Sequence, residues 1–144
     1  MARVLGIDYG TKKIGLAVTD PLQIICSPLT TVPTREIFDF LDNYLKEEVV
    51  ECMVIGDSLN TDGTPSQIAH LVVGFVRKLK KLYPNIEFAM QDERFTSIDA
   101  RQIILQSGLK KKKRRDKSLV DKVSASLILQ AYMEGKRGWN SGMV

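Results

Sequence analysis

The stretch GIDYGTKKIGLAVTD, Gly6–Asp20, decides the fold. It reads as two apolar β-strands, at 3–9 and 13–19, with a short polar turn between them, and so predicts a hairpin. Asp8 lies inside the first of these strands. Aspartate is depleted in strands, and burying a carboxylate without a partner is costly. Because a strand interior offers Asp8 no cheap structural role, we interpret it as a functional residue.

Length and composition indicate one globular domain. The chain has 144 residues, a size typical of a single domain with a substantial core. No apolar run approaches the roughly 18 residues of a membrane helix, and the N-terminus lacks the pattern of a signal peptide. We therefore expect a cytoplasmic protein without membrane contact. The domain is expected to span 1–137, followed by a frayed tail at 138–144.

The cysteines and the histidine give little support to a Cys/His metal site. Cys26 and Cys52 each lie in an apolar context and are not part of a C-x-x-C pair, so we expect small buried hydrophobic residues. His70 lies within a helical pattern and has no obvious metal-binding neighbours in the sequence.

Positive charge is concentrated in one short segment. The formal net charge is +4, yet KKKKRRDK at 110–117 holds seven basic residues and one acidic residue, so the rest of the chain is slightly acidic. Such a concentration indicates a phosphate-rich partner, with a solvated charged loop as the alternative. The residues expected to bind nucleic acid are Lys110, Lys111, Lys112, Lys113, Arg114, Arg115 and Lys117, with Lys12 and Lys13 in the hairpin turn.

Strands and helices alternate after the hairpin. Apolar runs predict strands at 29–32, 51–55 and 86–90. A hairpin followed by alternating helices and strands predicts a three-layer α/β domain, in which helices flank a mixed five-stranded sheet.

Four helices are expected from apolar spacing and from capping residues. They begin at Thr34, at Thr64 with a capping box over Thr64-Pro65-Ser66-Gln67, at Thr96 (ending near Gly108), and at Ser118. The residues expected to face the core are Ile37, Phe38, Leu41 and Leu45 in the first helix, Ile68, Leu71, Val72, Phe75, Val76, Leu79 and Leu82 in the second, and Val120, Val123, Leu127 and Ala131 in the last.

Acidic residues follow the ends of three predicted strands. Asp8 ends the first strand, Asp57 follows 51–55, and Asp92 and Glu93 follow 86–90. The carboxyl ends of parallel strands meet at one edge of a sheet, so we expect these acids to converge there. Like charges held together require a cation or a shared proton, and carboxylate oxygens without nearby His or Cys suit one or two Mg²⁺ or Mn²⁺ ions. Carboxylates beside a basic segment are typical of a nuclease.

Some of these acids also have structural explanations. Asp92 or Glu93 could form an ion pair with Arg94, which follows them in the sequence. Asp121 stands three residues after Ser118, where it could cap the last helix and interact with the helix dipole. The residues alone leave these alternatives open.

Four stretches resemble, in the same order, the YqgF/RuvX family of bacterial proteins: GIDYGTKKIGLAV, LNTDGT, DERFTS and VDKVSASLILQAYME. The resemblance runs from Arg3 to about Glu134, and four ordered motifs in one short domain are a specific signal. Holliday junction resolution and processing of the 5′ end of pre-16S ribosomal RNA are ascribed to this family. The resemblance implies an RNase H-like fold, a Mg²⁺-type cofactor and a cytoplasmic location.

The resemblance also implies which residues form the site. It implies that Asp8, Glu93 and Asp121 are catalytic, metal-binding acids. Asp92 and Arg94 belong to the same motif as Glu93 and are expected to support it, with Arg94 holding a phosphate or orienting an acid.

One loop departs from the family pattern. Where GLPLNxDG is expected, this chain has GDSLNTDG, so Asp57 and Ser58 replace an apolar residue and a proline. Without that proline the loop is less restrained. Asp57 is thereby an additional acid near the expected site, either as a supporting residue or facing solvent.

The function expected from residues and resemblance together is metal-dependent hydrolysis of phosphodiester bonds, most of all at the 5′ end of pre-16S rRNA. The alternatives are resolution of DNA junctions, for which two symmetric cuts favour a homodimer over a monomer, and a non-catalytic nucleic-acid or ribosome-associated module. The hairpin also resembles the first phosphate motif of the sugar kinase, actin and heat-shock ATPase superfamily, but one short domain lacks the second wall of that cleft.

Overall fold

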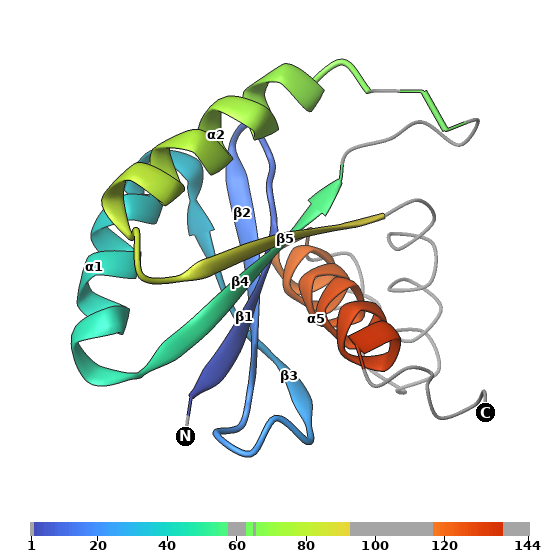
Figure 1. The fold of residues 1–144 in the computed structure, drawn as a ribbon. Helices are drawn as coiled ribbons and strands as arrows, with labels where there is room; N and C mark the ends of the chain where they lie inside the picture. The colour runs from blue at the N-terminus through green and yellow to red at the C-terminus, as the bar shows by residue number, and fades with distance from the viewer. Residues whose placement is uncertain (1, 58–62, 65, 93–116, 137–144) are drawn as a thin grey trace.

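The N-terminal hairpin lies at the centre of a mixed five-stranded sheet (Figure 1). The structure is a computed structural model that describes residues 2–57, 63–64, 66–92 and 117–136. The sheet order is β3-β2-β1-β4-β5. Its strands are β1 (Arg3–Asp8), β2 (Lys13–Thr19), β3 (Cys26–Pro33), β4 (Val50–Asp57) and β5 (Glu87–Asp92).

Strand directions explain why the sheet is mixed. β1 is antiparallel to β2, and β2 is antiparallel to β3, whereas β1, β4 and β5 run parallel. The strands predicted at 3–9, 13–19, 51–55 and 86–90 are confirmed to within about two residues. The strand predicted at 29–32 is longer than expected, because pairing with the whole of β2 extends it to Cys26–Pro33.

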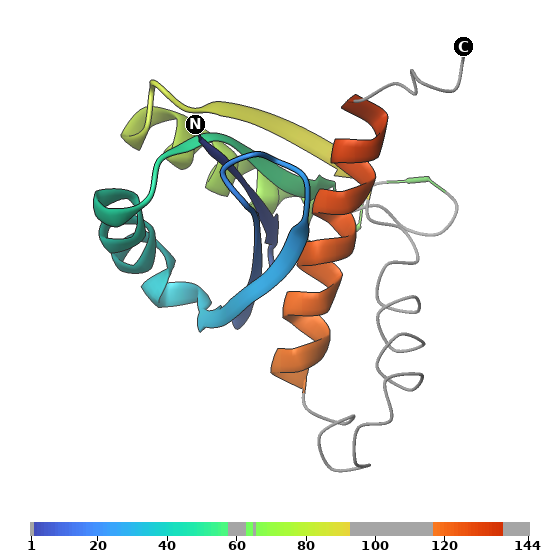
Figure 2. The same cartoon turned by 90° about the horizontal axis from the view of Figure 1, so that it is seen from below.

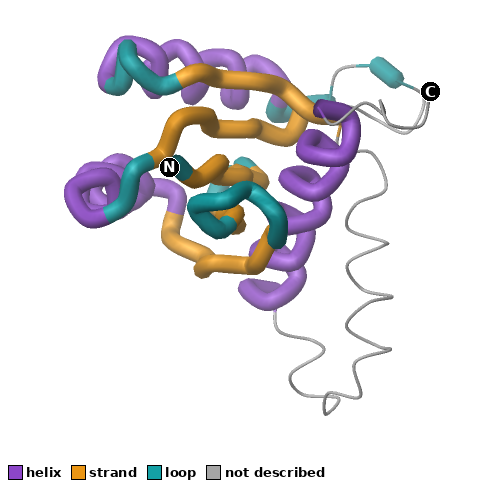
Figure 3. The backbone as a smooth tube through the Cα atoms, turned by 60° about the horizontal axis from the view of Figure 1, so that its bottom comes forward, coloured by secondary structure: helices purple, strands orange, loops and turns teal. Residues whose placement is uncertain are grey.

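Helices cover both faces of the sheet and give the expected three layers. A short η1 (Thr34–Glu36) leads into α1 (Ile37–Glu47), which lies with α2 (Ala69–Leu82) on one face. The long α5 (Lys117–Lys136) crosses the other face (Figure 2), and the strands lie between the two helical layers (Figure 3). Among the residues described, the structure contains no helix with both the length and the apolar character to cross a membrane.

Two expectations about α2 are wrong. The helix begins at Ala69 instead of Thr64, and Ile68 precedes it without a side-chain cap. The expected inward residues Leu71 and Leu82 are 39% and 47% exposed. The core on this face takes a narrower stripe from α2, formed by Val72, Phe75 and Leu79 against strand residues such as Leu5, Ile7 and Leu16. The helix predicted at 96–108 and the tail at 138–144 lie outside the described residues.

The last helix presents a different face to the sheet than its apolar spacing predicted. Val120 is buried as expected, but Ala131 is exposed, which corrects the prediction that it faces the core. The buried stripe of α5 is Val120, Ser124, Ala125, Ile128, Leu129 and Met133.

Two strand glycines account for this choice of face. A Cβ atom on Gly6 would lie 2.8 Å from the Leu129 Cβ and 3.0 Å from the Ala125 carbonyl oxygen, and one on Gly15 would lie 2.1 Å from the Asp121 carbonyl oxygen. Glycine at both positions therefore lets the backbone of α5 lie directly on β1 and β2. Apart from these contacts, the α5 side of the sheet is lined by Val4, Ala17, Cys52 and Val54.

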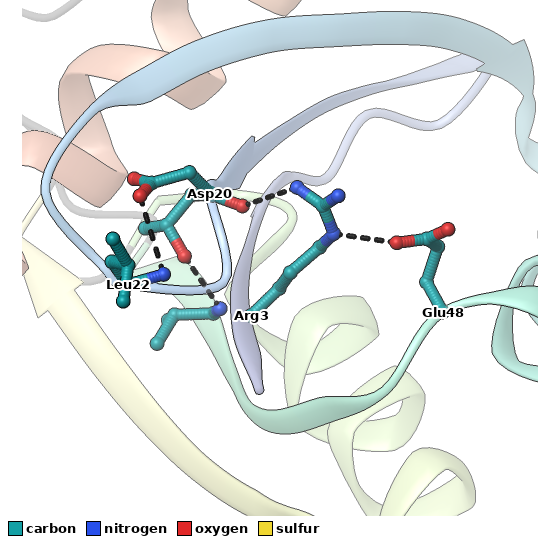
Figure 4. A network of polar contacts seen from close by, with 6 residues as sticks. Arg3, Asp20, Leu22 and Glu48 are labelled. Carbon is teal, nitrogen blue, oxygen red and sulfur yellow. Dashed lines mark hydrogen bonds and ion pairs between the residues drawn. The ribbon is translucent and has the colours of Figure 1, made fainter. Parts of the chain in front are cut away.

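Polar contacts fix the edge of the sheet where β1 begins (Figure 4). Arg3 Nε donates to Glu48 Oε1 at 2.7 Å, and Arg3 Nη1 donates to the Thr19 carbonyl at 2.9 Å. In the turn after β2, the Asp20 carboxylate accepts backbone N–H bonds from Leu22, Ile24 and Ile25 at 3.2, 2.8 and 2.7 Å. One side chain thus supplies the acceptors for most of this turn.

Stability is expected to depend on the ionisation of Asp20. The backbone N–H of Ile25, followed by those of Ile24 and Leu22, holds the pKa of Asp20 below its ordinary value of 3.8. Because the folded pKa is depressed, the contribution is complete above 3.8 and is lost as the pH falls through the folded pKa. Urea unfolding of Asp20→Asn and wild type between about pH 2 and pH 7 is expected to show a stability difference that disappears at the acid end.

Glu51→Gln removes one exposed charge from β4 outside this turn and controls for net charge. A difference between wild type and Asp20→Asn that stays constant down to pH 2 would show that the backbone bonds do not depend on the charge of Asp20.

Candidate functional site

A pocket of about 620 Å³ lies at the edge of the sheet where β1 ends and β2 begins. Two acids and two lysines line it together with neutral residues of the hairpin turn and the start of α2. The lining residues are Asp8, Tyr9, Gly10, Thr11, Lys12, Lys13, Ile68 and Asp121.

The carboxylates of the pocket come from a strand and from a helix on its surface. Asp8 is the last residue of β1, and its partner across the β1–β2 ladder is Gly15. The backbone of α5 at Asp121 lies against this same Gly15. Asp8 and Gly15 lie on the face of the sheet that α5 covers, the same face as Gly6 and Ala17. The pairing of β1 with β2 and the packing of α5 on β2 therefore bring the carboxylates of Asp8 and Asp121 to one pocket.

The lysines of the pocket belong to a turn that is tied down. The Thr34 hydroxyl donates to the Gly10 carbonyl at 2.7 Å, and the Thr34 N–H donates to the Lys12 carbonyl at 2.9 Å. Lys12 and Lys13 are both exposed. The turn is therefore held by two bonds from the start of η1, while its two lysines are exposed and line the pocket.

Asp57 and Asp92 lie at the same edge of the sheet but on its other face. They are direct partners in the β4–β5 ladder. Ile55 and Phe88, which precede them by an even number of residues, pack into the core under α1 and α2. Since side chains alternate along a strand, Asp57 and Asp92 are directed to the α1/α2 side, whereas Asp8 is directed to the α5 side.

The other residues expected in the site lie outside the described ranges. Glu93 and Arg94 are not among the described residues, nor are Lys110, Lys111, Lys112, Lys113, Arg114 and Arg115; Lys117 begins α5, but its side chain is not described. Cys26 and Cys52 are not joined by a disulfide and pack in the core under α5, with Cys26 partly buried and Cys52 buried; His70 is exposed on α2.

The donor set of the pocket suits a hard divalent ion. Within the described ranges no group of three His, Cys, Asp or Glu residues is placed to hold a metal, so the pocket offers Asp8 and Asp121 alone. Mg²⁺ in proteins is commonly held by one or two carboxylates, with water and substrate phosphate completing its coordination. The two carboxylates therefore fit Mg²⁺ or Mn²⁺, and they do not fit a structural zinc site.

Sequence reasoning missed four pocket residues, Tyr9, Gly10, Thr11 and Ile68. Tyr9 and Thr11 flank Gly10 in the turn, and their position next to Asp8 and the lysines was a usable signal. Ile68 reaches the pocket only through the way α2 packs on the sheet, and no local pattern marks it.

Comparison with known proteins gives consistent matches over nearly the whole chain. The sequence model described as "RuvX: Holliday junction resolvase" matches residues 2–135. A protein of Flavobacterium johnsoniae is 47% identical over 137 residues, which are 95% of this chain and 99% of the relative, and one of Bacteroides fragilis is 48% identical over the same shares. Both carry the name "Putative pre-16S rRNA nuclease".

A solved structure matches the fold. "T. thermophilus RuvC in complex with Holliday junction substrate" aligns with a TM-score of 0.53 and 14% identity, over 96% of this chain and 97% of that one. At this identity the likeness shows the fold alone. It confirms the expected RNase H-like fold with its mixed five-stranded sheet.

Divalent ions are expected to stabilise the protein through the pocket carboxylates. Mn²⁺ at about 100 times its Kd should add about 2.7 kcal/mol to the free energy of unfolding, a rise of several degrees in Tm. Asp8→Asn is expected to lose this rise, because one of the two carboxylates is gone. Glu51→Gln, which removes one exposed carboxylate at the other end of β4, should keep it. Thermal melts in EDTA and in Mn²⁺ measure the difference, and equal rises in all three proteins would exclude Asp8 as a ligand.

Proposed function

This chain belongs to the RuvX family, and from that premise we propose that it is a metal-dependent nuclease that processes the 5′ end of pre-16S rRNA. Membership confirms the resemblance carried by the four sequence motifs. The names of the family and of the curated relatives agree on a hydrolase that acts on phosphodiester bonds. The observation that carries the proposal is the pocket in which Asp8 and Asp121 lie beside the lysines of the hairpin turn.

In the proposed site, Asp8, Asp121 and Glu93 hold one or two Mg²⁺ or Mn²⁺ ions. Glu93 is included because it follows β5 directly in the sequence and belongs to the DERFTS motif that resembles the family. Arg94 is proposed to orient an acid or hold a phosphate.

Asp92 and Asp57 are proposed as supporting acids at the same edge. Because their strands direct them to the α1/α2 face, we assign them no direct contact with the ion. Their charges are still close enough to the sheet edge to affect how a cation is held there, with a strength that depends on salt.

The chain's own residues orient the reaction. When bound, a divalent ion supplies an activated water and neutralises negative charge at the reacting phosphate. Asp8 is fixed by the sheet and Asp121 by the helix, so their oxygens are held without a loop's freedom. Lys12 and Lys13 are proposed to bind the phosphates next to the bond that is cut. Hydrolysis of that bond is proposed to leave a 5′-phosphate and a 3′-hydroxyl.

Relatives favour RNA over a DNA junction as the substrate. Proteins 47–48% identical over nearly their whole length are named for pre-16S rRNA, whereas the protein solved with a Holliday junction is only 14% identical. The description of the family favours the second candidate, resolution of DNA junctions. With an rRNA-processing role we also propose a cytoplasmic location. A single cut is compatible with a monomer, while paired cuts in a junction favour a homodimer.

Cleavage of two labelled substrates tests the proposal. A structured RNA with the 5′ flank of 16S rRNA and a four-way DNA junction are each incubated with Mg²⁺, Mn²⁺ or EDTA. We expect metal-dependent cutting of the RNA by wild type and by the control variant Glu51→Gln, with at least a roughly hundredfold loss in Asp8→Asn, since one ligand of the site is removed.

The other outcomes select among the alternatives. Preferential cutting of the junction, with a dimer in sedimentation, would replace the RNA proposal by resolution of DNA junctions. Retained, salt-sensitive binding without cutting of either substrate would contradict catalysis and leave a non-catalytic nucleic-acid module.

The basic segment at 110–117 is expected to contribute salt-dependent affinity. Replacing three lysines together by Ala, Lys111, Lys112 and Lys113, should weaken the binding of every RNA sequence by a similar factor. The slope of log K against log salt should fall by roughly 0.7–0.9 for each phosphate that is no longer neutralised by a lysine. Lys46, Lys80 and Lys81, which are exposed at the ends of α1 and α2 away from the pocket, give a matched triple-Ala control. Equal slopes in both triple variants, measured by filter binding, would remove the segment from the interface.

A further inference from the structure

We propose that Gly15 is a positioning residue for the metal site: its missing side chain sets the depth at which α5 lies on the sheet, and so places the Asp121 carboxylate beside that of Asp8. This inference rests on the proposed metal-dependent function. A strand residue that has no polar side chain would thus determine the distance between the two carboxylates of the site.

Gly15 contacts both halves of the carboxylate pair through the backbone. It is the ladder partner of Asp8 in β2. A Cβ atom on Gly15 would lie 2.1 Å from the carbonyl oxygen of Asp121, 2.4 Å from its carbonyl carbon and 3.0 Å from the backbone nitrogen of Lys122. The residue that carries the helix carboxylate therefore lies directly over the residue that pairs with the strand carboxylate.

Backbone conformation does not explain the glycine at this position. Gly15 lies in β2, paired with Asp8 of β1 on one side and Thr31 of β3 on the other, and its φ is outside the left-handed region that Gly63 adopts with a φ of 90°. Other residues adopt such a strand conformation, and most favour it more than glycine does. The close approach of α5 is the feature of the structure that only glycine allows here.

An added side chain would move Asp121 more than a metal site tolerates. The atoms it would meet are main-chain atoms of α5, so a change of side-chain rotamer cannot relieve the contact. Ordinary contact begins near 3.4 Å, so the helix would retreat by roughly 1.3 Å, whereas metal–ligand distances are held to about 0.2 Å. Asp8, fixed in β1, would not follow.

Gly6 provides a matched control on the neighbouring strand. A Cβ atom there would meet the Leu129 Cβ at 2.8 Å and the Ala125 carbonyl at 3.0 Å, a smaller overlap placed farther along α5 from Asp121. Gly6→Ala therefore disturbs the same helix–sheet contact but spares the end of the helix that carries the carboxylate.

Mn²⁺ binding measures the effect without any assay of cleavage. Wild type, Gly6→Ala, Gly15→Ala, Asp121→Glu and the double variant Gly15→Ala/Asp121→Glu are titrated with Mn²⁺, and free ion is followed by its EPR signal. Sucrose in the buffer favours the folded chain, which is verified by circular dichroism. We expect an affinity about 10- to 100-fold weaker in Gly15→Ala, the loss typical when a supporting partner of a metal ligand is removed, and little change in Gly6→Ala.

The glutamate variants separate positioning from a general loss of structure. When α5 packs directly on Gly15, the side chain introduced by Asp121→Glu is one methylene too long for the site. This variant should therefore bind Mn²⁺ more weakly than wild type. In the double variant the longer side chain offsets the retreat of the helix, so affinity should rise above that of Gly15→Ala. A purely structural role for Gly15 predicts no such rescue.

Each contrary result has a distinct meaning. Wild-type affinity in a folded Gly15→Ala, or in Asp121→Glu, would overturn the positioning role while leaving the proposed nuclease intact. An absence of Mn²⁺ binding to wild type itself would overturn the metal site and this inference together.

Discussion

Direct contact between the backbone of α5 and the N-terminal hairpin is the constraint on which the site depends. Gly6 and Gly15 remove the side chains that would otherwise separate the helix from β1 and β2. The helix then buries its small residues Ser124 and Ala125, with larger apolar residues beyond them against the sheet. The same contact decides where Asp121 lies, so the packing of one face of the sheet and the geometry of the carboxylate pocket are a single structural feature.

Strand alternation sorts the acids at the carboxyl edge of the sheet. β1, β4 and β5 end together, and a view of the backbone alone would place Asp8, Asp57 and Asp92 in one cluster. Side chains that alternate along each strand separate them, with Asp8 toward α5 and the other two toward α1 and α2. Two carboxylates at the same end of the sheet can therefore share an ion only if their side chains also lie on the same face of the sheet.

Short apolar runs predicted the strands correctly, whereas the capping box at Thr64 and the features that depend on distant contacts were misread. The hairpin and the parallel strands follow from short apolar runs, and Asp8 was predicted to be functional because a carboxylate is out of place in a strand. Asp121 is different: the residues alone allowed a helix cap, and only the family resemblance indicated a site residue. Apolar side chains lie around much of α5, so the face that packs inward is chosen by Gly6 and Gly15, far away in the chain. The spacing of apolar residues along the helix does not predict that face, which is why Ala131 was expected in the core and is exposed.

The pocket joins the first strand of the chain to the last helix described, and this order has a consequence during synthesis. A ribosome makes the hairpin early, whereas α5, which packs on Val4 of β1 and Ala17 of β2 in the folded protein, is made later. Before α5 is synthesised, the chain lacks Asp121, which carries the second carboxylate of the pocket. An incomplete chain, still attached to a ribosome and surrounded by ribosomal RNA, therefore lacks the paired acids, and the same docking step that covers this face of the sheet also completes the pocket.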